Sequence, residues 1–291
     1  MKALIFGANG QDGHYLIETL KSRNVDAVGV SRSGDWVRGD VGRLADVETL
    51  VREHKPHYIF HLAARSTTRH DALFENHETI STGSLNVLEC AQRHCPEARV
   101  FITGSGVQFR NAGTPIGEDA PFEASSPYAV ARIQSTFAAR YYRSLGLRAY
   151  VGYLFHHESP LRKPGHLSRL ITLAVRRIAG GSGETLELGD ISVVKEWAFA
   201  GDIARGILSL VDQDEVKEAV IGTGEGRSVE EWLALCFGMV GRSWRDHVRL
   251  KPAFRAEYGA LVSDPRRLRS IGWAPQVSFE KLAEMMMQAE A

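Results

Sequence analysis

The stretch ALIFGANGQDGHYLIETL, residues 3–20, decides the fold. Its first four residues are apolar and predict a buried strand, and its last six predict an amphipathic helix. Between them, Gly7, Gly10 and Gly13 follow the spacing GxxGxxG. This spacing is typical of a turn that binds a dinucleotide, because the glycines permit a tight turn, the approach of a diphosphate and close helix packing. The alternative is an ordinary turn between a strand and a helix.

The residues around these glycines are the first predicted binding residues. Free amides and the positive end of the helix dipole attract phosphates at a helix N-terminus. The cofactor-binding residues expected in this turn are Gly7, Asn9, Gly10, Gln11, Asp12 and Gly13.

The alternation of strand and helix continues through the first half of the chain. Short apolar strands that alternate with helices predict a parallel sheet covered on both faces. We therefore expect an α/β protein with a Rossmann-like, doubly wound parallel sheet. The further apolar runs are residues 27–30, 58–63, 100–103 and 149–155.

The pattern changes after residue 160, where a polar loop begins. We expect a helix at LSRLITLAVRRIAGG, strands at TLELG, KEWAFA and EAVIGTG, and a helix capped by Asp202. The expected dinucleotide-binding domain comprises residues 1–160 and about 195–224. A smaller, partly interleaved substrate domain is expected to comprise residues from about 161 to 194 and from about 225 to 291.

Composition and charge weigh against several classes of function. Lys and Arg total 35, as do Asp and Glu, so the 291-residue chain has a formal net charge of zero. This balance does not favour nucleic acid as a partner. No apolar run reaches the roughly 18 residues of a membrane span, so no membrane segment is expected. The three cysteines form no CxxC pair, which favours reduced thiols and a cytoplasmic protein. No metal site is expected.

The end of the second expected strand selects the cofactor. Its sequence VGVSRSG contains Arg32 and no acid. An acid there would bind a ribose 2′-hydroxyl, whereas an Arg accommodates a 2′-phosphate, so the sequence favours NADP(H). The alternative is that Arg32 lies in a surface loop without a ligand. Further residues expected beside the cofactor are Asp40, Val41, Leu62, Ala63 and Ala64.

Several motifs resemble those of the extended short-chain dehydrogenase/reductases, the NAD-dependent epimerase/dehydratase family. They are the GxxGxxG turn, a strand ending in LAA, and SSPYAVAR at residues 125–132. The segments GQDGHYL, LFHHESPLR, KEWAFAGDIA and GWAP are most similar to the GDP-mannose 4,6-dehydratases. This resemblance covers nearly the whole chain. It implies a nicotinamide cofactor and a nucleotide-sugar substrate that is expected to be GDP-linked.

The resemblance also implies a catalytic set. In this family a Tyr exchanges a proton with the substrate oxygen, a Ser or Thr hydroxyl assists, and a Lys contacts the nicotinamide ribose and favours the ionised Tyr. By position these roles fall to Tyr128, Ser105 and Arg132, and Tyr128 and Arg132 would also contact the cofactor. Arg132 keeps the charge of Lys on a larger, planar group. The alternative is a solvated Arg132 beside an inactive site.

Three further positions depart from the family that the sequence resembles. Val107 replaces the Glu that performs the acid–base work of dehydration, and no acid occurs between Ser105 and Gly117. Ile80 and His156 stand where the relatives carry Asn. The sequence thus retains the groups for hydride transfer and lacks the one for dehydration.

The resemblance places substrate-binding residues in the second half of the chain. Arg and Lys bind diphosphates, and Arg can do so through two parallel hydrogen bonds. For each of these candidates the alternative is an ordinary charged residue of the surface. Trp197 and Trp273 are expected to pack in the core. The candidates are His156, His157, Glu158, Arg162, Lys195 and Arg255.

Three functions are compatible with this pattern. The leading hypothesis is an NADPH-dependent reductase of a 4-keto-6-deoxy nucleotide sugar, with GDP-4-keto-6-deoxymannose as the expected substrate, in deoxysugar biosynthesis for surface glycans. The second is a dehydratase that uses another acid, or an epimerase. The third is a non-catalytic protein that binds NADP(H) or a nucleotide sugar. Because relatives often dimerise through the corresponding helices, residues 75–94 and 127–145 are expected to form a homodimer or larger oligomer.

Overall fold

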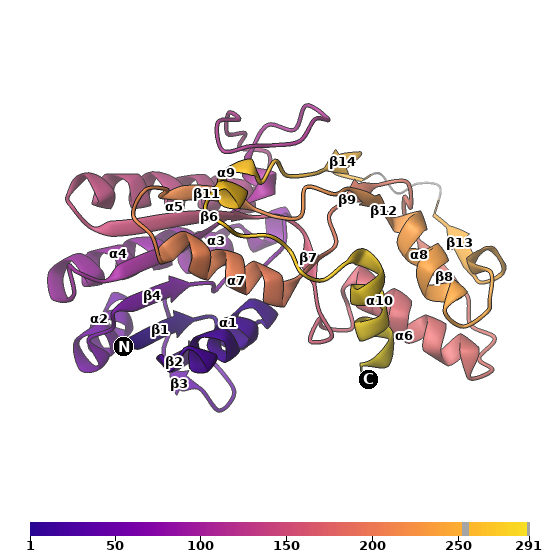
Figure 1. Ribbon diagram of the computed structural model, residues 1–291, viewed down its shortest axis with the longest axis horizontal. Helices are drawn as coiled ribbons and strands as arrows, with labels where there is room; N and C mark the ends of the chain where they lie inside the picture. Colours follow the sequence, from indigo (N-terminus) through magenta and orange to yellow (C-terminus); the bar gives the residue numbers. More distant parts are fainter. Residues whose placement is uncertain (252–255, 290–291) are drawn as a thin grey trace.

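A seven-stranded sheet forms the centre of the larger of two units (Figure 1). A computed structural model describes residues 1–251 and 256–289. All neighbouring strands are parallel, in the spatial order β11-β6-β5-β4-β1-β2-β3. Their bounds are β1 (Lys2–Phe6), β2 (Asp26–Ser31), β3 (Val37–Arg38), β4 (Tyr58–His61), β5 (Arg99–Ser105), β6 (Arg148–Leu154) and β11 (Glu218–Ile221).

Helices cover both faces of this sheet. Successive side chains of a strand point to opposite faces. Accordingly, Leu4 and Phe6 of β1 belong to one buried cluster, and Ala3 and Ile5 belong to another. The expected doubly wound α/β fold is therefore confirmed. The first cluster contains residues of α2 (Leu44–His54), α4 (Gly83–His94) and α5 (Pro127–Ser144), and the second contains residues of α1 (Gln11–Ser22) and α7 (Ala200–Val211).

A smaller unit lies beside the sheet (Figure 1). It has its own buried core. Trp197 stacks on Trp232 with the ring centroids 4.4 Å apart, and both side chains are buried, as expected for Trp197. The helices of this unit are α6 (Leu167–Ala179), α8 (Val229–Gly238) and α10 (Phe279–Gln288). Its short strands are β8 (Leu186–Leu188), β9 (Val194–Lys195), β12 (Arg227–Ser228), β13 (Val248–Leu250) and β14 (Ala260–Leu261).

Part of the C-terminal segment returns to the larger unit. Leu268 of α9 (Arg266–Ser270) and Trp273 pack in the cluster that contains α1 and α7. Trp273 is buried, in keeping with its expected packing role. The division expected from the sequence places Leu268 and Trp273 in the substrate domain. Because both instead pack in the core of the larger unit, the two units are interleaved here as well as around residues 195–224.

Asp202 does not cap α7, contrary to the sequence prediction. The helix begins at Ala200, and Asp202 lies within its first turn with the side chain fully buried. Its Oδ2 accepts hydrogen bonds from the backbone N–H groups of Gln276 and Val277, at 2.8 and 2.9 Å. A buried carboxylate requires such donors. Asp202 therefore fixes the C-terminal segment against α7.

The segment KEWAFA forms two short strands, where one was predicted. β9 ends at Lys195 and pairs with β12 and β14, whereas β10 (Ala198–Phe199) pairs with β7 (His157–Glu158). Between them, Glu196 is fully buried and accepts hydrogen bonds from the backbone N–H groups of Thr223 and Ser263, both at 2.6 Å. These long-range donors hold Glu196 in place where the chain passes from one small sheet to the other.

Candidate active site

A cavity of about 390 Å³ lies where β5 and β6 end. Ser105 is the last residue of β5, and Tyr128 lies in the first turn of α5. The helix starts there because Ser126 accepts a hydrogen bond from the backbone N–H of Ala129 at 3.1 Å and Pro127 follows the cap. The carboxyl ends of parallel strands are the usual place for a ligand in such sheets. The fold thus brings Ser105, Tyr128 and Arg132 to one cavity.

Arg132 is buried beside Tyr128 rather than solvated. The residue is 2% exposed, and its Nη1 donates a hydrogen bond to the carbonyl oxygen of Thr103 at 2.5 Å. Its guanidinium carbon lies 5.0 Å from the centroid of the Tyr128 ring. Nε of Arg132 is buried and has no hydrogen-bond partner among the described residues. The guanidinium is therefore fixed by the backbone and retains an unused donor.

Val107 lines the cavity beside Ser105. It lies in the short helix η3 (Gly106–Gln108) and also borders an adjoining cavity of about 580 Å³. Its isopropyl side chain can neither donate nor accept a proton. Among the described residues, Asp12 is the single carboxylate that lines the cavity with Ser105 and Tyr128.

Gln108, which sequence reasoning missed, holds the backbone of Ser105. Its fully buried side chain accepts a hydrogen bond from the N–H of Ser105 at 2.8 Å and donates one to Thr136 Oγ1 at 3.1 Å. These bonds link η3 to α5. The sequence signal was the spacing of Ser105 and Gln108, which matches a capping box.

A second cavity, of about 290 Å³, follows the glycine turn and shares Leu62 with the first. Most predicted cofactor residues line it. Lys163, which the sequence did not single out, also lines it. The predicted residues in its wall are Gly7, Asn9, Gly10, Arg32, Asp40, Val41, Leu62, Ala63 and Ala64.

Backbone geometry requires glycine in this turn. Gly7 has a φ of 101°, which side chains other than glycine rarely adopt. A Cβ on Gly13 would lie 2.5 Å from the carbonyl oxygen of Gly7, so Gly13 allows the close helix packing that was predicted. The tight turn places the N-terminal amides of α1 beside the cavity, where phosphates bind favourably. The residues present therefore fit a dinucleotide.

Arg32 lies at the edge of the second cavity and shares a carboxylate with a second arginine. Its Nη2 is 3.7 Å from Glu75 Oε1, and Arg65 Nη1 is 2.5 Å from Glu75 Oε2. Arg65 was not identified from the sequence. Two guanidinium groups gathered around one carboxylate suit an anion such as a phosphate.

His157 joins the glycine turn to β7. Its Nε2 is 2.8 Å from Asp12 Oδ1, and its Nδ1 is 2.7 Å from the carbonyl oxygen of Phe155. Burial alone would lower the pKa of His157 and raise that of Asp12, but their mutual attraction reverses both effects. The pKa of His157 is raised and that of Asp12 is lowered, which favours an ion pair.

His156 lies at the centre of a buried cluster of charged side chains. Its Nδ1 is 2.6 Å from the carbonyl oxygen of Glu196, and its Nε2 is 2.9 Å from Glu158 Oε1 and 3.1 Å from Lys195 Nζ. Arg162 Nε donates a hydrogen bond to Glu158 Oε2 at 2.6 Å. Burial, together with the charge of Lys195, lowers the pKa of His156 to about 4, so the ring is neutral near pH 7.

The predicted substrate residues fall into two groups. His156, His157 and Arg162 line the first cavity. Glu158 and Lys195 are 2% and 8% exposed and do not line it; they contact His156 from within the protein. Arg255 lies outside the described residues. The geometry thus favours a positioning role for Glu158 and Lys195.

Ile80 belongs to the core and not to the cavity. It is fully buried in η2 (His77–Thr82), a π-helical turn between α3 (Leu73–Asn76) and α4. Its carbonyl oxygen accepts hydrogen bonds from Ser84 Oγ at 2.7 Å and Ser135 Oγ at 3.1 Å. Ile80 therefore contributes to packing between α4 and α5.

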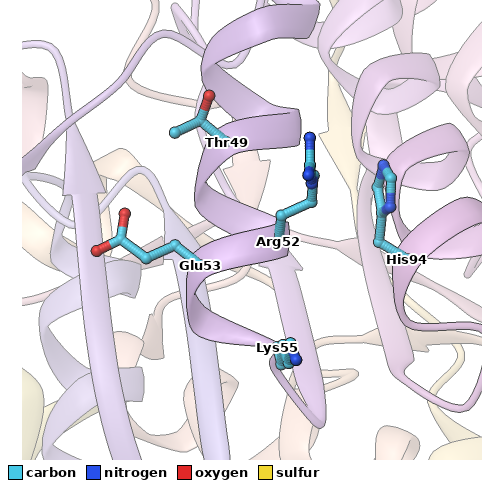
Figure 2. A pocket seen from close by; sticks show the side chains of 5 residues that line it. All are labelled: Thr49, Arg52, Glu53, Lys55 and His94. Atoms are coloured by element: carbon cyan, nitrogen blue, oxygen red, sulfur yellow. The ribbon is translucent and has the colours of Figure 1, made fainter.

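A further hollow, of about 500 Å³, is formed by α2 and α4 and contains none of the predicted site residues (Figure 2). It is lined by Thr49, Arg52, Glu53, Lys55 and His94. Within the described part of the chain, no group of three or more His, Cys, Asp or Glu side chains is placed to hold a metal ion. No helix among those residues is long and apolar enough to cross a membrane.

Comparisons with known sequences give a consistent result. Residues 4–286 match the sequence model of the family described as GDP-mannose 4,6 dehydratase. GDP-mannose 4,6 dehydratase 2 from Arabidopsis thaliana is 31% identical over 321 aligned positions, which cover 99% of this chain and 86% of that protein. GDP-mannose 4,6-dehydratase from Vibrio cholerae is 29% identical, with 99% of this chain and 93% of that protein covered.

Solved structures share the fold. UDP-glucose 4-epimerase from Thermotoga maritima, solved with UDP-glucose, has a TM-score of 0.88 and 20% identity, with 99% of this chain and 98% of that chain covered. RMD from Pseudomonas aeruginosa, complexed with NADPH, has a TM-score of 0.85 and 19% identity, with 99% and 96% covered. At these identities the similarity shows the fold alone.

Proposed function

This chain belongs to the GDP-mannose 4,6-dehydratase family, and from that premise we propose that it is an NADPH-dependent reductase of a GDP-linked 4-keto-6-deoxy sugar. The observation that carries the proposal is the composition of the cavity wall. Ser105, Tyr128 and Arg132 line it together with Val107, which the family resemblance aligns with the acid used in dehydration.

The side chains of the cavity suit proton delivery to a carbonyl oxygen. Bound NADPH would supply a hydride to the carbonyl carbon. Tyr128 then donates its hydroxyl proton to the oxygen, which becomes an alcohol. The hydroxyl of Ser105 donates a hydrogen bond that polarises the carbonyl before transfer. Arg132 places a fixed positive charge beside the Tyr128 ring, where it favours the phenolate left after proton donation.

The preference for NADPH over NADH rests on Arg32. It lines the cofactor cavity at the end of β2, which carries no acid in its last residues or in the turn that follows as far as Gly34. Arg65 approaches the same carboxylate as Arg32 and adds a second positive charge. A 2′-phosphate would replace Glu75 between the two guanidinium groups.

A dehydratase is the second candidate, because the family is a dehydratase family and Asp12 lines the catalytic cavity. Asp12 would have to exchange the proton of the elimination step. Its lowered pKa and its ion pair with His157 oppose this role, since they keep the carboxylate ionised. Incubation with GDP-mannose and NADP⁺, followed by NMR, decides between the candidates: a 4-keto sugar that disappears in Asp12→Asn supports the dehydratase.

A homodimer formed through α4 and α5 is part of the proposal. Phe137, Tyr141 and Leu145 repeat at four-residue intervals and are 56%, 60% and 50% exposed, and Leu85 on α4 is 47% exposed. A row of exposed apolar side chains on one helical face is typical of an interaction surface. Sedimentation should show a dimer that Tyr141→Glu dissociates. A wild-type monomer at micromolar concentration would contradict this part of the proposal.

The reductase is tested by mixing the enzyme with GDP-4-keto-6-deoxymannose and NADPH and following the loss of NADPH absorbance. We expect turnover that requires the keto sugar and is absent with GDP-mannose. Thermal unfolding with and without NADPH shows in parallel whether the protein is folded and binds the cofactor. Cofactor binding without oxidation over a series of keto sugars would favour a non-catalytic binding protein.

A further inference from the structure

The loop between β7 and α6, residues 159–166, is attached to the glycine turn at its start. Ser159 Oγ donates a hydrogen bond to Gln11 Oε1 at 2.8 Å. Gln11 Nε2 in turn donates one to the carbonyl oxygen of His157 at 3.3 Å. Together with the Asp12–His157 pair, these bonds hold the loop against the N-terminus of α1. The loop therefore starts from a fixed point beside the turn expected to bind the diphosphate.

Lys163 extends from this loop to the cofactor cavity. Every other residue that lines the cavity lies between Phe6 and Thr79, so Lys163 is the one wall residue contributed from the second half of the described chain. It is exposed, and no carboxylate of the described residues forms an ion pair with it. Arg32, the other cation in the wall, is already paired with Glu75.

The charges of the cavity wall leave Lys163 available for an anion. Asp40, the acid in the wall, accepts a hydrogen bond from the N–H of Gly42 at 3.0 Å. The N-terminal amides of α1 add positive potential at the other side of the glycine turn. A lysine ammonium is a compact cation with three donors on a flexible stem, and it can therefore follow a phosphate group.

We propose that Lys163 binds the diphosphate of the dinucleotide from the loop 159–166, so that the cofactor is held between the glycine turn and the loop that leads to the substrate unit. This inference rests on the proposed function in one respect: the protein must bind a dinucleotide cofactor. Arg32 remains the residue assigned to the 2′-phosphate. Lys163 is thus a binding residue that should contribute equally to NADPH and NADH.

Direct binding measurements test this assignment without a sugar substrate. NADPH and NADH are titrated into wild type, Lys163→Ala, Lys163→Arg and Lys21→Ala, with protein fluorescence as the readout. Lys21 is an exposed cation at the far end of α1 and serves as the matched control. Loss of a hydrogen bond to a charged group should weaken both cofactors by about tenfold or more in Lys163→Ala. Lys163→Arg and Lys21→Ala should bind within about threefold of wild type.

The ratio of the NADPH and NADH affinities distinguishes a role in binding the diphosphate from a role in binding the 2′-phosphate. In Lys163→Ala, the NADPH/NADH ratio should equal that of wild type, and ADP should lose affinity by the same factor. Unchanged affinity for all three ligands would overturn the proposal, as would a loss confined to NADPH. Because no keto sugar is present, failure of the reductase proposal leaves this result intact and is detected separately by turnover.

Discussion

The guanidinium carbon of Arg132 lies 5.0 Å from the centroid of the Tyr128 ring, one helical turn away on α5. The same guanidinium donates a hydrogen bond to the carbonyl oxygen of Thr103. An arginine held at two points in this way offers a fixed charge to the ring. The position therefore retains the positive charge of the lysine that the family resemblance leads one to expect there.

Replacing Arg132 by Gln removes the charge but keeps an N–H donor for Thr103. We expect kcat for the keto sugar to fall by about tenfold to 100-fold, because a phenolate at Tyr128 loses its neighbouring cation. Arg132→Lys, which keeps the charge, should retain more activity. Steady-state kinetics measures both variants. Equal kcat in wild type and Arg132→Gln would show that the charge plays no part in the reaction.

Tyr128→Phe removes the proposed proton donor and leaves the ring that packs on Arg132. Loss of a general acid should lower kcat by about 10² to 10⁴-fold. The affinity for NADPH, measured by fluorescence, should change little because the ring and Arg132 remain. Tyr141→Phe, on the exposed face of α5, is the matched control and should keep wild-type kcat. Substantial turnover in Tyr128→Phe would assign the proton donor elsewhere.

Arg32→Ala should weaken the binding of NADPH by about tenfold or more and leave the affinity for NADH unchanged, because only NADPH carries the 2′-phosphate. Glu75→Gln should have the opposite effect on NADPH, since the carboxylate that competes for Arg32 is removed. Binding titrations with both cofactors measure the two ratios. An Arg32→Ala protein that prefers NADPH as strongly as wild type would exclude Arg32 as the selecting residue.

The Asp12–His157 ion pair should make part of the stability depend on pH. The pKa of His157 is raised above its ordinary 6.5, so its contribution is complete below pH 6.5 and is lost as the pH rises through the folded value. The pKa of Asp12 is lowered below 3.8, so its contribution is present above pH 3.8 and is lost as the pH falls through the folded value. The pair therefore stabilises most between these limits.

Denaturant unfolding of wild type and His157→Gln measures this effect. The variant should be less stable by about 1–2 kcal/mol near pH 6, and the difference should shrink as the pH is raised. Arg132 and Arg162 also lower the pKa of Asp12 and are present in both proteins, so their effect cancels in the comparison. If the difference in stability between wild type and His157→Gln grew with pH, it would contradict the conclusion that His157 is protonated in the ion pair.

The sheet and the glycine turn were predictable because their signals are local. Apolar runs of strand length and the GxxGxxG spacing depend on neighbouring residues, and both were confirmed in the fold. The glycine turn also identified Asp12 as a binding residue. It did not indicate the contact of Asp12 with His157, which lies 145 residues further along the chain. Local patterns thus indicated the elements and not the partners.

The two failed predictions, the Asp202 cap and the single strand at KEWAFA, share one cause with the missed residue Lys163. Asp202 and Glu196 are acids at positions that resemble a helix cap and the middle of a strand, but both are buried and bonded to backbone N–H groups far away in sequence. Lys163 lines a cavity otherwise built from residues before position 80. Such long-range contacts override local propensity, and no spacing rule in a single sequence reveals them.

The most direct measurement for the proposed reductase is the fate of the hydride. The enzyme is incubated with GDP-4-keto-6-deoxymannose and NADPH carrying deuterium at the transferable position, and the sugar product is examined by NMR. The proposal predicts oxidation of one NADPH for each sugar and a single deuterium at sugar C4, both slowed by about 10² to 10⁴-fold in Tyr128→Phe. An unchanged keto sugar without deuterium at C4, from a folded protein that binds NADPH, would contradict it.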